Sequence, residues 1–90
     1  MDLQSIPTRS EHVISRRGPD SVTVLLNTSA GSYFTLDEVG GRIWELCDGT
    51  TTVDSIAVQL TSEYEAERAQ IEADILELLA ELSSEGLVSV

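Results

Sequence analysis

A five-residue strand that runs directly into a capped helix is the feature that most constrains this fold. Residues 32–36 (Ser-Tyr-Phe-Thr-Leu) combine aromatic and β-branched side chains that suit a strand. Asp37 follows at once, and an aspartate at this position can accept a hydrogen bond from the first turn of a helix. The helix is expected over residues 38–47 and ends at Asp48-Gly49. This junction predicts a small domain that contains both strands and helices.

Two further strands are expected before this junction. Residues 21–27 are rich in β-branched side chains and are flanked by turn residues, and residues 11–16 alternate around Val13. Connections this short require antiparallel pairing, with the second strand in the centre. Residues 1–10 have no periodic pattern and contain Pro7, so we expect a loose N-terminal lead-in to a single domain over residues 11–90.

Two more helices are expected after the junction. Thr51 or Thr52 can cap a helix that starts at Val53, and a longer helix is expected over residues 65–84 with Gly86 as its stop. The fold class is therefore α+β, a three-stranded antiparallel sheet followed by three helices. The small Gly40-Gly41 pair within the first helix indicates close packing against another element. Trp44 and Cys47 are expected in the core.

Composition argues against several classes of function. The chain has 16 Asp and Glu against 5 Lys and Arg, a formal net charge of −11, so a DNA phosphate backbone would repel it. One His, one Cys and no phosphate-binding loop or metal-ligand spacing argue against an enzyme and predict no cofactor. No apolar run is long enough to cross a membrane, and no secretory signal is visible. A single Cys cannot form an internal disulfide, so the reducing cytoplasm is the expected compartment.

The third strand and the third helix together suggest a peptide-binding surface. Edge strands usually carry charge or proline that discourages foreign pairing, but residues 32–36 carry neither, which suits the addition of a partner strand. The apolar stripe of the third helix is wider than one contact face requires, and Asp74, Glu77 and Glu81 form an acidic row beside it. An apolar floor with an acidic rim suits a peptide that carries apolar anchors and lysines.

Several ordered segments resemble the PqqD-like family, the recognition elements that bind leader peptides of ribosomally made natural products. The matching segments are Leu26-Asn27, residues 31–37, residues 43–49, residues 52–57, Leu60, Tyr64, Leu82 and Gly86-Leu87-Val88. The chain has Asp37 where the family more often has Asn. The Gly18-Pro19 turn and the chain length are more similar to the stand-alone elements of lasso peptide biosynthesis than to the quinone-cofactor protein.

The resemblance implies a winged helix-turn-helix-like fold that binds a leader peptide as a fourth strand, beside residues 32–36 and against the third helix. It also implies a monomer that presents the precursor to a separate leader peptidase and cyclase, without nucleic acid or membrane. The expected peptide-binding residues are Ser32, Tyr33, Phe34, Thr35, Leu36, Ile71, Asp74, Ile75, Leu78, Glu81 and Leu82. Two alternatives remain, a peptide chaperone of pyrroloquinoline quinone biosynthesis and a docking subunit for a folded protein.

Overall fold

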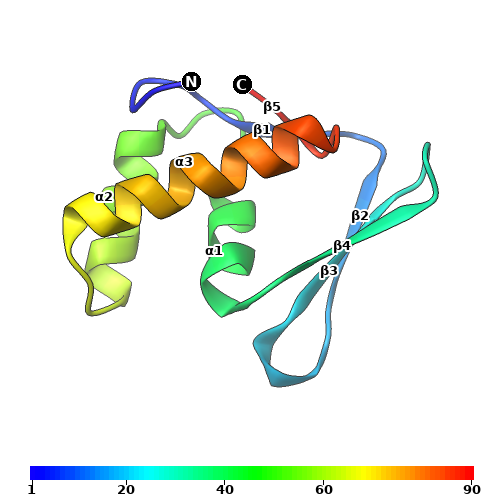
Figure 1. The fold of residues 1–90 in the computed structure, drawn as a ribbon, viewed down its shortest axis with the longest axis horizontal. Helices are drawn as coiled ribbons and strands as arrows, with labels where there is room; N and C mark the ends of the chain where they lie inside the picture. Colours follow the sequence, from blue (N-terminus) through cyan, green and yellow to red (C-terminus); the bar gives the residue numbers. More distant parts are fainter.

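A three-stranded sheet and three helices make up most of the computed structural model, which describes all 90 residues (Figure 1). Strands β2 (Val13–Arg17), β3 (Thr23–Asn27) and β4 (Ser32–Leu36) pair antiparallel in the order β2-β3-β4. The predicted meander with a central second strand is therefore confirmed. The β3 strand starts two residues later than expected, because Ser21 has a φ of 63°, which is incompatible with a strand. Residues Pro19–Ser21 form a short 3₁₀ turn instead.

The helices are α1 (Glu38–Leu46), α2 (Val53–Glu63) and α3 (Arg68–Ser84). The Asp37 carboxylate accepts a 2.7 Å hydrogen bond from the Gly40 N–H, which confirms the predicted cap of α1. Thr52 caps α2 in the same way. Helix α3 begins three residues later than expected, because Glu67 still has extended backbone. None of these helices is long and apolar enough to span a membrane.

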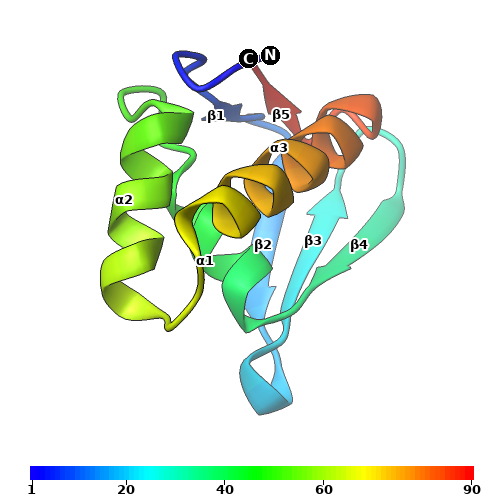
Figure 2. The ribbon, with the colours of Figure 1, turned by 60° about the vertical axis from the view of Figure 1, so that its left-hand side comes forward.

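The core lies between the sheet and the three helices, and α3 crosses over both α1 and α2 (Figures 1 and 2). Trp44 is 4% exposed and Cys47 is fully buried, as predicted. The other buried hydrophobic residues are Leu25, Leu36, Ile43, Val53, Ile56, Ala57, Leu60, Ile71, Ile75, Leu79, Leu82, Leu87 and Val88. The sheet contributes only its helix-facing side to this core, since buried and half-buried residues alternate along β3.

The expectation of a loose lead-in over residues 1–10 is wrong. Strand β1 (Thr8–Arg9) pairs antiparallel with β5 (Val88–Ser89), so the two ends of the chain lie together (Figure 2). Pro7 is fully buried. The first N–H groups of a helix have no partner within the helix, and here two of them donate to the lead-in. These bonds are Val53 N–H to Ser5 O and Asp54 N–H to Leu3 O, both 2.9 Å.

Candidate functional site: a groove between β4 and α3

The outer edge of β4 has no partner strand. The β4 strand pairs only with β3, so on its other side alternate backbone N–H and C=O groups are unpaired within the sheet. Neither charge nor proline interrupts Ser32–Leu36. A bare edge of this kind can accept another strand.

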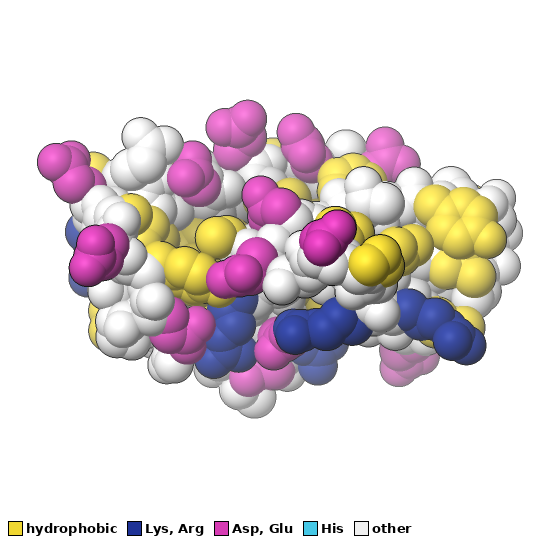
Figure 3. Space-filling model, turned by 90° about the horizontal axis from the view of Figure 1, so that it is seen from below, with side chains coloured by type: hydrophobic (Ala, Val, Ile, Leu, Met, Phe, Trp, Pro, Cys, Tyr) yellow, Lys and Arg dark blue, Asp and Glu magenta, His cyan; other side chains and the backbone are white.

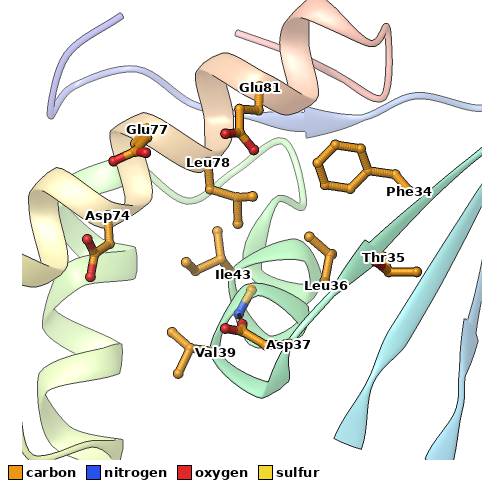
Figure 4. Close-up of a pocket in the computed structure, with 11 residues that line it drawn as sticks. Phe34, Thr35, Leu36, Asp37, Val39, Ile43, Asp74, Glu77, Leu78 and Glu81 are labelled. Atoms are coloured by element: carbon orange, nitrogen blue, oxygen red, sulfur yellow. Dashed lines mark hydrogen bonds between the residues drawn. The ribbon is translucent and has the colours of Figure 1, made fainter.

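A groove of about 480 Å³ lies between β4, the start of α1 and one side of α3. Four apolar side chains, Leu36, Val39, Ile43 and Leu78, point toward one another across it (Figure 4). The complete lining is Phe34, Thr35, Leu36, Asp37, Val39, Gly40, Ile43, Asp74, Glu77, Leu78 and Glu81. The groove therefore has an apolar floor bordered by carboxylates and contains no basic residue.

The rim carboxylates have few partners within the chain. Asp37 caps α1, and Asp74 accepts a 2.9 Å hydrogen bond from Gln70. Neither Glu77 nor Glu81 takes part in an ion pair, because all five ion pairs of the chain lie elsewhere. No three carboxylates gather closely enough to hold a metal ion. The rim is thus a row of uncompensated negative charge that attracts cationic side chains.

The structure brings about half of the predicted site residues to the groove. Phe34, Thr35 and Leu36 line it from β4, and Asp74, Leu78 and Glu81 line it from α3. Ser32 is exposed near the far end of β4 and does not line the groove. The role of these residues in peptide binding stays a prediction.

Three predicted site residues lie in the core instead of the groove. Ile71 is 6% exposed, and Ile75 and Leu82 are fully buried. Together with Leu79 they form a row spaced three or four residues apart, which is one face of α3. This face packs toward α2 and β5, so only the neighbouring face, with Leu78, borders the groove.

Tyr33 also lies away from the groove. Side chains alternate along a strand, so Tyr33 points to the opposite face of the sheet from Phe34. It is 71% exposed there and lines a second hollow, on the outer face of the sheet.

Sequence reasoning missed the contribution of α1 to the groove. Val39 and Ile43 are four residues apart on α1, and both line the groove beside Leu36. The sequence contained a signal for this contribution in the direct junction of strand and helix. A helix that starts one residue after a strand must place its first turn next to the end of that strand. Val39 is 36% exposed, so part of its side chain is open to the groove.

The single thiol is not part of this groove. Burial raises the pKa of Cys47 to about 12, and its Sγ donates to the carbonyl oxygen of Ile43. A thiol with this pKa stays protonated at neutral pH, so it cannot supply a thiolate nucleophile.

Comparison with known proteins agrees with this architecture. Residues 23–88 match the family described as coenzyme PQQ synthesis protein D (PqqD). The chain belongs to the PqqD family. Among curated PqqD-family proteins, the chain is 36% identical over 53 residues to a PqqA binding protein of Rhodopseudomonas palustris, strain BisB5. It is 40% identical over 53 residues to one of Xanthomonas oryzae pv. oryzae, strain PXO99A.

These curated matches are partial. The matched segment makes up 59% of this chain, and 52% of the Rhodopseudomonas and 58% of the Xanthomonas protein. The chain thus spans about half the length of the curated relatives that it matches.

Solved structures with the PqqD-family fold are similar over nearly the whole chain. TbiB1 in complex with the TbiA(beta) leader peptide has a TM-score of 0.81 at 33% identity, covering 91% of this chain and 94% of that one. A lasso peptide synthetase B1 complexed with the leader peptide has a TM-score of 0.83 at 26% identity, covering 96% and 100%.

The PqqD truncation of Methylobacterium extorquens PqqCD, a stand-alone recognition element, has a TM-score of 0.83 at 32% identity, covering 99% of this chain and 94% of that one. These matches confirm both the predicted resemblance to PqqD-like recognition elements and the predicted fold class.

Proposed function

We propose that this PqqD-family protein is a non-catalytic recognition element that binds the leader peptide of a ribosomally synthesised precursor. The observation that carries the proposal is the unpaired edge of β4 beside an apolar groove with an acidic rim. Two similar solved structures are complexes with a leader peptide, which supports the same class of ligand here.

The leader is added antiparallel to β4 as a fourth strand. Its backbone bonds to the free N–H and C=O groups of Ser32–Leu36, which gives affinity that depends little on sequence. Alternate side chains of an added strand point to the groove side of the sheet. Apolar anchors at those positions contact Leu36, Val39 and Leu78, and neighbouring lysines or arginines meet Glu77 and Glu81.

The bound precursor is then presented to separate enzymes in the cytoplasm, a leader peptidase and a cyclase of lasso peptide biosynthesis. The lasso assignment draws on the similarity to lasso peptide synthetase B1 over 96% of this chain. A second candidate is a peptide chaperone of pyrroloquinoline quinone biosynthesis, favoured by the curated PqqA binding proteins.

An NMR titration of isotope-labelled protein tests the proposal. The ligands are the leader half of a precursor encoded beside this chain, the same residues in scrambled order, and a short DNA duplex. We expect shifts at residues 32–36, at Val39 and along the Asp74–Glu81 side of α3 with the true leader alone. Shifts that are equal for the scrambled peptide, or none with the leader, would overturn it and favour a docking subunit for a folded protein.

A further inference from the structure

The face of the sheet that points away from the helices carries an exposed apolar row. Ile14, Leu26 and Tyr33 are register partners across β2, β3 and β4, so their side chains lie on one face. Ile14 is 51% exposed and Tyr33 is 71% exposed, while Leu26 is half-buried. With Val24 they line a hollow of about 400 Å³. Nothing in the chain covers this row.

Positive charge borders the same hollow. Arg16 and Arg17 lie at its edge, and no carboxylate lines it. Seen from below, dark-blue arginine side chains lie beside yellow apolar ones at the end of the molecule that holds the strands (Figure 3). The acidic residues of the groove rim belong to the other side of the sheet, so the two sides differ in charge.

Arg16 is the one arginine of the five whose side chain has no hydrogen bond or ion pair within the fold. Arg9 donates to the carbonyl oxygens at the end of α1, and the other three pair with glutamates or an aspartate. The unpaired guanidinium of Arg16 therefore lies beside an exposed apolar row, in a chain of net charge −11. Apolar surface next to an uncompensated charge is typical of a protein interface.

We infer that this outer face, defined by Ile14, Arg16, Val24, Leu26 and Tyr33, docks the enzyme that processes the bound precursor. The inference rests on the proposed function. The matching surface of the enzyme presents apolar side chains next to a carboxylate that pairs with Arg16. Nucleic acid and anionic membranes offer negative charge over a wide area, and the net charge of −11 repels both.

The outer face and the groove can be occupied at the same time. They lie on opposite sides of one sheet and share no lining residue. An enzyme on the outer face therefore leaves the leader in place. The active site of the enzyme then lies within reach of the precursor segment that leaves the groove.

The test measures binding of the purified leader peptidase encoded beside this chain to the leader-bound protein, by calorimetry. Ile14→Ser and Arg16→Gln each remove one exposed contact on β2, away from the β4 edge that binds the leader, and we expect each to weaken enzyme binding by about fivefold or more. The leader Kd, measured first in the same variants, should not change. Arg16→Gln should also reduce the salt dependence of enzyme binding.

Two control variants match these changes elsewhere on the surface. Val58→Ser truncates an α2 side chain that is 50% exposed, and Gln4→Glu shifts the net charge by the same amount as Arg16→Gln. Enzyme binding that is unchanged in Ile14→Ser and Arg16→Gln, equally weakened in the controls, or absent with wild-type protein that binds leader would overturn the inference. Line broadening of outer-face signals with rising concentration of this chain alone would assign the face to a second copy instead. Failure of the leader itself to bind would count against the proposed function, separately from these results.

Discussion

Gly41 of α1 lies directly against Thr23 of β3. A Cβ atom built on Gly41 would stand 2.6 Å from the Thr23 Oγ1, closer than real Cβ contacts allow. This contact explains why a glycine occupies the interior of α1, where it disfavours the helix, and it confirms that the Gly40-Gly41 pair serves packing. The close approach of α1 to β3 also fixes where Val39 and Ile43 stand beside β4.

Gly41→Ala should lower the free energy of unfolding by about 1–2 kcal/mol. Overpacking costs about 1–3 kcal/mol, and the better helix propensity of alanine offsets up to about 1 kcal/mol of that. Urea denaturation measures the change. In a Thr23→Ala background, which removes the Oγ1, the same substitution should cost less. An equal cost in both backgrounds would mean that Thr23 is not the obstacle.

Leu78→Glu should weaken leader binding by about tenfold or more without unfolding the protein. Leu78 is half-buried on the groove side of α3, so a glutamate there stays hydrated but removes apolar floor and adds negative charge. Calorimetry with the leader peptide measures the loss, and circular dichroism checks the fold. Val58→Glu places the same charge on an exposed helical site away from the groove and should bind as wild type. Wild-type affinity in Leu78→Glu would move the binding site elsewhere.

Removing rim charge should slow association with a leader that carries lysine or arginine. We expect the double variant Glu77→Gln, Glu81→Gln to bind about threefold to tenfold more weakly at low salt, because long-range attraction is lost. The difference from wild type should shrink as salt rises. Stopped-flow fluorescence at several salt concentrations measures both effects. Glu65→Gln, Glu67→Gln removes equal charge outside the groove, and an equal effect there would point to net charge instead of the rim.

The Arg42–Glu63 pair should make stability depend on pH in the acid range. The guanidinium of Arg42 bonds to both carboxylate oxygens of Glu63 at 2.8 and 2.9 Å, and Gln59 donates to one of them. These bonds, that of Arg42 first, lower the pKa of Glu63 from 4.5 to about 2. A lowered carboxyl pKa gives stability that is fully present above 4.5 and is lost as the pH falls through 2.

Glu63→Gln should therefore lose less stability than wild type between pH 4.5 and pH 2. Thermal unfolding at pH steps across this range gives the two curves. The variant should still lose some stability at acid pH, since hydrogen bonds from the Thr50 backbone and the Thr51 side chain also lower the pKa of Asp48 to about 2. Glu65→Gln, which removes a carboxylate that has no ion pair, should follow the wild-type curve. A curve for Glu63→Gln that is parallel to wild type would contradict the pairing.

Local signals predicted the elements that depend on neighbouring residues. The bounds of β4, the Asp37 cap and the Gly86 stop follow from short-range rules, and Gly86 has the positive φ of 71° expected after a helix. The pairing of β1 with β5 could not be predicted, because it joins two-residue strands from opposite ends of the chain. Such short strands have no periodicity to recognise.

The site was predictable in its elements and less so in its side chains. Both β4 and α3 were expected to form it, but the apolar stripe of α3 covers two adjacent faces. Which face is buried depends on the positions of α2 and β5, and these are fixed only by the tertiary fold. Ile71, Ile75 and Leu82 were therefore assigned to the groove although they complete the core.

The alternation of side chains along β4 has a consequence for any strand added to its edge. Half of the side chains of the added strand would point into the groove. The other half would project beside Tyr33, where apolar ones would extend the apolar row of the outer face. A partner bound to that face would then contact both the added strand and this chain. The affinity of that partner would then depend on whether a peptide is bound at the β4 edge. It would also depend on the outward-facing residues of the peptide, which the partner could contact while the peptide stays in the groove.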